Sequence, residues 1–314
     1  MARPAEKAPP LQPVAAPSVR PRYGLPGALV RTARPKQWSK NVLVFAAAGA
    51  AGVLSHAVPA ERVLACFGLF CAVSSGTYFL NDVIDAGADR RHPVKRHRPV
   101  AAGSLPVPAA LTAAAFLMGA GVALGVVLRP QLGLVLGMYV ALQLAYSTVL
   151  KHLPVYDLAA VAAGFLLRAI AGAVAVPVRV SEWFLIVTTF GSLLMVTGKR
   201  LAEHAELGEE RGGHRATLDA YSTNFLRIVL AISATAAMVG YSLWAFSLEP
   251  AALHHSDPIW YQLSTVPVLL ALLHFTFLVE QGRGAHPEEL VLRDRQLQLL
   301  GLVWLLLFSL GVYG

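Results

Sequence analysis

Charged side chains are scarce in this sequence, since Asp, Glu, Lys and Arg together make up only 14% of its 314 residues. A typical soluble domain carries roughly 25%, and so few charges could not cover the surface of a soluble protein. Apolar residues reach 56% of the chain, which is far too much for a largely disordered protein. The composition therefore predicts an integral membrane protein.

Cysteine is nearly absent as well. Cys66 and Cys71 lie close together within an apolar stretch, and their spacing fits neither a disulfide framework nor a metal site. His92 and His97 have no third nitrogen or sulfur ligand near them in the sequence, which argues against zinc. The sequence thus predicts neither a disulfide framework nor a zinc site.

The N-terminal region contains no apolar core of the kind found in a cleaved signal peptide. Residues 1–28 are instead rich in proline, a composition typical of disordered segments. We predict that they form a disordered cytoplasmic tail. Residues 29–314 are then expected to form a single transmembrane domain that carries the site.

Apolar segments that can cross a bilayer recur along the rest of the chain. A spanning helix needs about 20 mostly apolar residues, and nine segments of suitable character predict an all-α integral membrane protein with nine transmembrane helices. The predicted spans are Val42–Val58, Val63–Leu80, Pro108–Leu128, Leu132–Leu150, Val155–Val176, Trp183–Gly198, Ile228–Leu248, Ile259–Val279 and Leu297–Val312.

Lysine and arginine are distributed unevenly over the predicted loops. The N-terminal segment and the loops after the second, fourth, sixth and eighth spans hold almost all of them, whereas the opposite side has only Arg62, Arg129 and Arg179. Cytoplasmic loops carry such an excess. We therefore predict a multi-pass protein of the plasma membrane with a cytoplasmic N-terminus and an external C-terminus. This bias also accounts for much of the net charge of +8, so nucleic acid is not expected as a partner.

The second predicted span ends in a run of polar residues. Tyr78, Asn81 and Asp85 share one helix face, and Asp82, Asp85 and Asp89 share an overlapping one, because steps of three and four residues stay in register. Neighbouring carboxylates repel each other unless a cation lies among them, and oxygen ligands suit Mg²⁺. We predict a magnesium site formed by this acidic stripe of Asn81, Asp82, Asp85 and Asp89. The alternatives are a solvated helix end, or salt bridges from Asp82 or Asp89 to the arginines that follow.

Basic residues flank the acidic stripe in the sequence. Arg90, Lys95 and Arg98 follow it directly, and carboxylates for a metal beside cations for phosphate form the arrangement that a diphosphate requires. Lys36 and Lys40 lie on one face before the first span, with a tryptophan between them. We give equal weight to two compatible interpretations: the tryptophan marks an interfacial anchor, and the two lysines reach a phosphate.

Two further polar clusters fall on the predicted cytoplasmic side. Asp157 and Arg168 lie on one face of the fifth span, and an intramembrane arginine costs at least ~2.5–3.5 kcal/mol, so it needs a partner. Asp157 is the nearby candidate, and a purely structural ion pair is the alternative. Lys199, Arg200 and Glu203 lie at the end of the sixth span and form the second cluster. The alternative to a functional role is an ordinary helix end at the membrane surface.

The segment from Asn81 to Asp89 resembles the first aspartate-rich motif of the UbiA-type membrane prenyltransferases. The resemblance implies their fold, with helices around a central cavity that opens to the cytoplasm. Residues 34–38, 89–95, 164–172 and 198–200 are similar to the branch that transfers phosphoribose to decaprenyl phosphate. Prenyl-transferring members usually carry a second pair of aspartates four residues apart. Here Asp157 is followed at that distance by Val161, which favours the phosphoribosyl branch.

The resemblance implies that 5-phosphoribose moves from 5-phosphoribosyl 1-diphosphate to a polyprenyl phosphate, with release of diphosphate, for the synthesis of cell-wall arabinan. Catalytic roles are expected for Asp82, Asp85 and Asp157. Substrate contacts are expected from Lys36, Lys40, Tyr78, Arg90, Lys95, Arg98, Tyr146, Lys151, Arg168, Lys199, Arg200 and Glu203.

Two other functions stay open on the sequence alone. A prenyltransferase would move a prenyl group from a prenyl diphosphate to an aromatic acceptor, and a transporter would explain many helices and an intramembrane Arg–Asp pair. A transporter would not explain a metal motif beside a basic loop. The sequence also leaves the oligomeric state open, a homo-oligomer included.

Overall fold

The computed structural model describes residues 24–206, 220–247, 257–285 and 287–313, and all the regular structure within these ranges is helical. The long helices are α3 (Ala57–Ile84), α5 (Val107–Leu128), α6 (Pro130–Thr148), α7 (Tyr156–Ala175), α8 (Glu182–Glu206), α10 (Thr223–Ser247), α11 (Ile259–Glu280) and α13 (Arg295–Tyr313). Short helical segments connect them: α1 (Leu25–Ala33), η1 (Pro35–Val44), α2 (Phe45–Ala50), η2 (Val53–Ser55), α4 (Ala86–Asp89), η3 (Lys95–His97), η4 (Leu150–His152), η7 (Arg283–Ala285) and α12 (Pro287–Arg293).

Seven helices are long and apolar enough to cross a membrane by length and composition: α3, α5, α7, α8, α10, α11 and α13. Each corresponds to a predicted span. Helix α6 has 19 residues, but its two glutamines lower its mean hydropathy. The count of nine spans is therefore not confirmed by the described residues.

The first predicted span, Val42–Val58, is not one continuous helix. The chain there forms the end of the 3₁₀ segment η1, then the short helix α2, then η2. Arg34 takes a left-handed conformation with φ of 53° immediately before Pro35, and Gly52 has φ of 70°. Arg34 lies before the predicted span, whereas Gly52 lies within it and interrupts regular helix geometry there. The segment is apolar, as predicted, but its backbone does not form one helix.

The tail boundary also differs from the expected one. Helix α1 begins at Leu25, inside the range 1–28 that the sequence predicts to be disordered. Its Ala28 and Thr32 are buried, and the helix packs against α3. Residues 1–23, which make up most of the predicted tail, lie outside the described residues.

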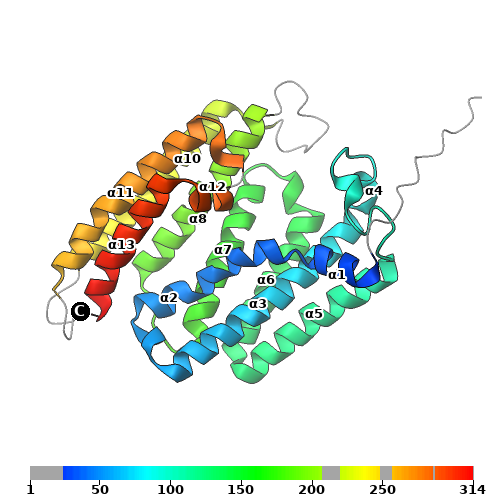
Figure 1. Cartoon of the computed structure of the whole chain (residues 1–314), viewed down its shortest axis with the longest axis horizontal. Helices are drawn as coiled ribbons and strands as arrows, with labels where there is room; N and C mark the ends of the chain where they lie inside the picture. The colour runs from blue at the N-terminus through cyan, green and yellow to red at the C-terminus, as the bar shows by residue number, and fades with distance from the viewer. Residues whose placement is uncertain (1–23, 207–219, 248–256, 286, 314) are drawn as a thin grey trace, which may run out of the picture.

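The long helices pack as neighbouring pairs, with α3 along α5, α8 along α10 and α11 along α13 (Figure 1). Apolar side chains form three core clusters, around α3, α6 and α7, around α8, α10 and α11, and around α1, α3 and α5. Burial of such apolar surface, together with close packing, stabilises the bundle.

Successive long helices run in alternating directions (Figure 1). Helices α3, α6, α8 and α11 therefore finish at the same end of the bundle, where α5, α7, α10 and α13 begin. We call this end the polar end, because most of the ion pairs of the described residues lie there. The alternation brings the acidic stripe and the predicted basic clusters together.

Helix α7 and the segment η1 approach each other very closely. A Cβ atom on Gly172 of α7 would lie 1.7 Å from the backbone oxygen of Val44, so only glycine fits at this contact. The close approach places η1 against the middle of the bundle. It thereby places Asn41, a buried residue of η1, beside a polar side chain of α7.

Candidate functional site

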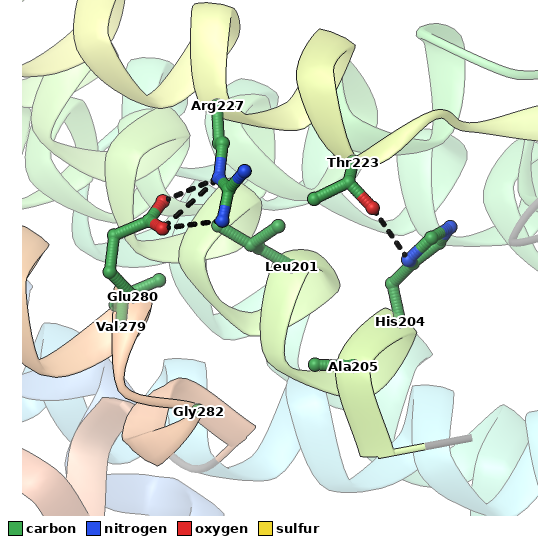
Figure 2. Close-up of a pocket in the computed structure, with 8 residues that line it drawn as sticks. All are labelled: Leu201, His204, Ala205, Thr223, Arg227, Val279, Glu280 and Gly282. Atoms are coloured by element: carbon green, nitrogen blue, oxygen red, sulfur yellow. Dashed lines mark hydrogen bonds and ion pairs between the residues drawn. The ribbon is translucent and has the colours of Figure 1, made fainter. Parts of the chain in front are cut away.

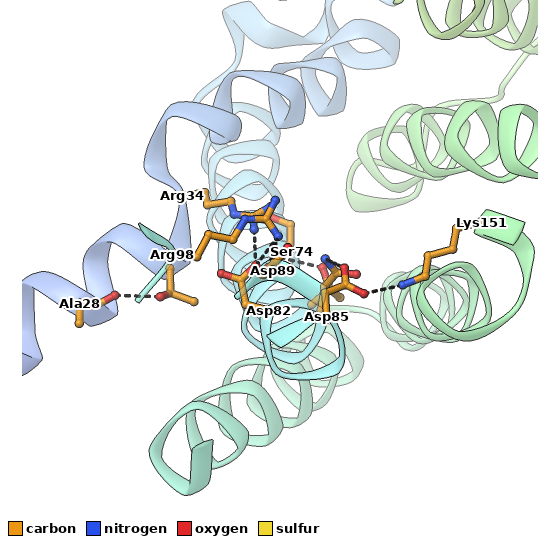
Figure 3. Close-up of polar contacts among 11 residues, drawn as sticks. Ala28, Arg34, Ser74, Asp82, Asp85, Asp89, Arg98 and Lys151 are labelled. Carbon is orange, nitrogen blue, oxygen red and sulfur yellow. Dashed lines mark hydrogen bonds and ion pairs between the residues drawn. The ribbon is translucent and has the colours of Figure 1, made fainter. Parts of the chain in front are cut away.

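The acidic stripe divides into two halves that face different partners (Figure 3). In the first half, Asp85 at the end of α3 accepts a hydrogen bond of 2.6 Å from the Nζ of Lys151 in η4. Asn81 Nδ2 donates to the other carboxylate oxygen of Asp85 at 3.1 Å. The side chain of Asp85 keeps 26% of its surface exposed. This half therefore presents oxygen ligands and one cation to the polar end.

The second half of the stripe is closed by arginines. Asp82 is buried and accepts hydrogen bonds from Arg34 and, at 3.3 Å, from Arg98. Asp89 accepts from Arg98 at 2.8 Å. The Arg34 guanidinium also lies 4.9 Å from the ring centroid of Tyr78, in a cation–π contact. The structure thus contains the salt bridges from Asp82 and Asp89 to a following arginine that the sequence offered as an alternative to metal binding.

Magnesium is compatible with the half of the stripe that contains Asn81 and Asp85. Mg²⁺ is usually held by one or two carboxylates, while water and substrate phosphates complete its shell. Across the described residues, no three His, Cys, Asp or Glu side chains are grouped so that they could hold a metal ion. The donor set therefore fits an ion bound together with a phosphate substrate, and it does not fit a site closed by protein ligands alone.

A second polar group forms where α7, α8 and α10 meet. Asp157, in the first turn of α7, has no exposed surface and accepts hydrogen bonds from Tyr221 O–H and, at 3.3 Å, from Arg200 Nε. Arg200 also donates to Glu203 at 2.6 Å. Lys199 Nζ lies 3.9 Å from Glu203 and remains 36% exposed. We call Asp157, Arg200, Glu203 and Tyr221 the Asp157 cluster.

The expected pairing of Arg168 with Asp157 is wrong. Arg168 is 5% exposed and donates to Asn41 Oδ1 at 2.8 Å, to Gly164 O at 2.7 Å and to Tyr139 O–H at 2.8 Å. Three aromatic rings lie 4.8, 5.5 and 5.8 Å from its guanidinium carbon. The two positions are eleven residues apart, which corresponds to about 16 Å along a helix, so the two side chains cannot meet. Arg168 instead ties α7 to η1 and α6.

The remaining predicted substrate residues differ in how far they are exposed. Lys36 and Arg90 are exposed, and Arg90 Nε donates to Ala101 O at 3.4 Å. Lys40, Lys95 and Tyr146 are half-buried. Their contact with a substrate stays a prediction.

A central cavity is not confirmed. A pocket of about 140 Å³ lies to one side of the site, between α8, α10 and α11 (Figure 2). It is lined by Leu201, His204, Ala205, Thr223, Arg227, Val279, Glu280 and Gly282. Ligand sites usually enclose roughly 300–1,000 Å³, so this pocket is too small for a nucleotide-sized donor or a lipid.

Two residues of the site were absent from the predicted set. Arg34 lies in the segment 34–38 that carries part of the resemblance, and its position just before the first span was a usable signal. Tyr221 gave no such signal, because it lies 64 residues from Asp157 in the sequence and the two meet only in the folded chain, where the segment before α10 reaches the start of α7. A lone tyrosine in a loop has no pattern from which a partner can be inferred.

Comparison with known sequences reveals similarity over nearly the whole chain. The family described as the UbiA prenyltransferase family matches residues 42–308. A decaprenyl-phosphate phosphoribosyltransferase of Mycolicibacterium smegmatis is 41% identical over 308 residues, which cover 95% of this chain and 96% of that protein. A protein of the same name from Corynebacterium glutamicum is 42% identical over 301 residues, covering 94% of this chain and 89% of that one.

Solved structures agree in fold. A UbiA homologue from Archaeoglobus fulgidus, bound to GPP and Mg²⁺, superposes with a TM-score of 0.68 at 16% identity, covering 90% of this chain and 98% of that chain. The apo UbiA homologue from Aeropyrum pernix gives 0.61 at 16% identity, covering 89% and 98%. The family match, the sequence relatives and the shared all-helical fold lead to one conclusion: the chain belongs to the UbiA prenyltransferase family.

Proposed function

We propose that this protein transfers 5-phosphoribose from 5-phosphoribosyl 1-diphosphate to a polyprenyl phosphate such as decaprenyl phosphate. The observation that carries the proposal is the identity of 41% and 42% to relatives named decaprenyl-phosphate phosphoribosyltransferase, over almost the full length of both chains. The site supports it independently, because its cations lie in two places rather than one.

The two places suit a donor with phosphates at both ends of a ribose. Lys151 lies beside Asp85 at one place, and Lys199 with Arg200 lies at the other, on the last turns of α8. The diphosphate would bind near Lys151, and the 5-phosphate would contact Lys199, which is the more exposed of the latter two cations. A prenyl diphosphate has an apolar tail in place of the 5-phosphate, and a cation there would lose hydration without gaining a partner.

The reaction breaks the bond between C1 of the ribose and the diphosphate oxygen, and forms a bond from C1 to an oxygen of the lipid phosphate. The bond electrons leave with the diphosphate, so the transition state gathers negative charge on the leaving group. Lys151 is placed to stabilise that charge through a charge-assisted hydrogen bond. The lipid phosphate is already anionic near neutral pH, so no general base is required.

Asn81 and Asp85 are the residues that we propose to hold Mg²⁺, which would supply further positive charge to the leaving diphosphate. Asp82 and Asp89 would act differently, by orienting Arg34 and Arg98 at the rim of the site. Asp157 is fully buried, so its role would be to orient Arg200 and not to contact the ribose.

We further propose that the polar end faces the cytoplasm. The bias of lysine and arginine toward the loops at this end supports that orientation, and so does the charged nature of a donor that cannot cross a bilayer. The domain of residues 29–314 would then carry the site on its cytoplasmic side. 5-Phosphoribosyl 1-diphosphate added to inverted membrane vesicles is expected to react, whereas right-side-out vesicles should remain inactive.

A transfer assay tests the function directly. Purified protein is incubated with decaprenyl phosphate, magnesium and 5-phosphoribosyl 1-diphosphate labelled in the ribose, and label is counted in the lipid phase. The wild type should transfer label, and Asp85→Asn should lose activity by roughly 10²-fold or more, as expected for loss of a metal ligand at the leaving group. Its melting temperature should stay close to that of the wild type, because the Asp85 side chain is partly exposed. Near-normal turnover by Asp85→Asn at saturating magnesium would remove Asp85 from the metal site.

A further inference from the structure

Tyr221 occupies a junction between three helices that the reaction scheme does not use. Its side chain is buried, with 4% of its surface exposed. The phenol O–H donates to the Asp157 carboxylate, and the phenol oxygen accepts a hydrogen bond of 2.6 Å from the backbone N–H of Val155. One hydroxyl therefore binds two groups at the start of α7. Burial and the hydrogen bond to Asp157 raise the pKa of Tyr221 above its usual value, so the phenol keeps its proton at neutral pH.

The backbone at Val155 shows what this hydroxyl holds. Val155 has φ of 71° and ψ of −48°, which a β-branched residue rarely adopts. Such a conformation persists only where the surroundings impose it. The hydrogen bond from its N–H to Tyr221 is the contact that orients this amide. Without the hydroxyl, the connection between α6 and α7 would lose the contact that favours its unusual backbone.

Tyr221 is itself fixed from two sides. His204 Nε2 lies 3.0 Å from the backbone oxygen of Tyr221, and since a carbonyl only accepts, Nε2 must donate. Thr223 O–H can then donate to Nδ1 of the same ring at 3.3 Å. The Tyr221 ring stacks on Phe225, with centroids 5.6 Å apart and planes 6° apart. Helices α8 and α10 thus provide a rigid support for the hydroxyl.

The connection that Tyr221 holds carries a cation of the proposed site. Lys151 lies four residues before Val155, in η4, and reaches Asp85 at 2.6 Å. Asp157, the other partner of the hydroxyl, receives Arg200 at 3.3 Å. Tyr221 is therefore the one described side chain that hydrogen-bonds both to the strained Val155 amide and to the partner of Arg200.

We propose that Tyr221 is a positioning residue, whose hydroxyl orders the 149–155 connection and so sets the place of Lys151 beside the acidic stripe. Its effect on catalysis rests on the proposed function. Its effect on the order of the connection does not, and both can be measured.

Tyr221→Phe removes the hydroxyl and keeps the ring that stacks on Phe225. The matched control is Tyr241→Phe in α10, the helix that begins just after Tyr221. Tyr241 is also buried, its O–H lies 2.6 Å from Ser264 Oγ, and it accepts from Trp304 Nε1 at 2.9 Å. Tyr241 lies toward the opposite end of α10, so the control reports what the loss of a buried tyrosine hydroxyl does to general stability.

Amide hydrogen exchange over residues 149–157 reads the order of the connection, whether or not the protein is active. We expect exchange to become roughly tenfold faster in Tyr221→Phe, the change that corresponds to the loss of one good hydrogen bond, and to stay at the wild-type rate in Tyr241→Phe. In the transfer assay, the KM for 5-phosphoribosyl 1-diphosphate should rise in Tyr221→Phe and not in Tyr241→Phe. The melting temperature should fall by a similar amount in both variants.

Unchanged exchange in Tyr221→Phe would overturn the proposal, and so would equal acceleration in both variants. Faster exchange with an unchanged KM in an active enzyme would also overturn it, because the connection would then be ordered without positioning anything for the donor. A wild type that transfers no label would contradict the proposed function instead, and the exchange comparison would still decide the role of Tyr221.

Discussion

Arg168 and Lys199 differ sharply in burial and in how tightly they are paired. Arg168 is 5% exposed and makes three hydrogen bonds to groups of the protein. Lys199 is 36% exposed, and its pair with Glu203 is loose at 3.9 Å. A phosphate can bind Lys199 without breaking the structure, whereas it would have to displace the partners of Arg168. Burial and pairing therefore favour Lys199 over Arg168 as a substrate ligand.

This difference predicts opposite effects of removing the two charges. Arg168→Met removes the donor to Asn41 Oδ1 and to the Tyr139 hydroxyl, and each buried polar group left unpaired costs about 1–3 kcal/mol. We expect a melting temperature lower by several degrees, with a near-normal KM for 5-phosphoribosyl 1-diphosphate in the folded fraction. Lys199→Met should raise that KM and leave the melting temperature almost unchanged. Kinetics and thermal unfolding of both variants check this, and a large rise of KM in Arg168→Met at normal stability would return Arg168 to the substrate site.

Sequence spacing could predict contacts within a helix but not between distant segments. Steps of three and four residues placed Asn81 beside Asp85 correctly, and the two hydrogen-bond in the structure. The partner of Arg168 could not be found in this way, because Asn41 lies 127 residues away and reaches it only after η1 packs on α7. Tyr221 was missed for the same reason.

At the scale of elements, the segment before α3 differs most from expectation. Hydropathy alone reads Val42–Val58 as a span, yet the chain forms a 3₁₀ segment and two short helical pieces there. The 3₁₀ geometry is less regular than the α-helix and is used in short stretches. Here it carries Asn41 to Arg168 and brings Val44 against Gly172. The irregular segment thus contributes to the polar interior of the bundle.

The contact at Gly172 gives a sharp test of this packing. Gly172→Ala would place a Cβ 1.7 Å from the backbone oxygen of Val44, so η1 must move, and overpacking of this kind costs about 1–3 kcal/mol or more. Gly137→Ala in α6 is the control, because nothing lies within 4 Å of its added Cβ and alanine favours a helix over glycine by about 1 kcal/mol. Thermal unfolding should show a loss for Gly172→Ala and none for Gly137→Ala. Equal stability of both variants would contradict the close approach.

Hydropathy did predict the membrane-spanning elements well where the chain is regular. Seven of the nine predicted spans correspond to candidate membrane helices, since length and apolar content are local properties. The helix ends were less well predicted. Helix α8 continues to Glu206, beyond the predicted end at Gly198, because Lys199, Arg200 and Glu203 extend the helix as good helix formers. Those added turns place the second group of cations at the polar end.

At the scale of the whole molecule, the alternating helices concentrate charge at one end and leave apolar surface along the sides. Exposed large apolar residues occur on α5, α10, α11 and α13, as expected for helices in contact with lipid. This arrangement would let a lipid phosphate reach the polar end from the membrane while a charged donor arrives from water. Composition predicted the membrane setting, and the sequence offered cations for two places, but the partners of those cations come from elements far apart in the chain.

The choice of donor tests this account most directly. Purified protein in liposomes is given decaprenyl phosphate, an aromatic acceptor, magnesium, and equal amounts of 5-phosphoribosyl 1-diphosphate and a prenyl diphosphate, and the products are identified by mass spectrometry. We predict that the lipid phosphate gains phosphoribose, that diphosphate is released, and that the aromatic acceptor remains unmodified. A prenylated aromatic product with no phosphoribosylated lipid would contradict the account and identify the protein as a prenyltransferase in the usual sense of its family.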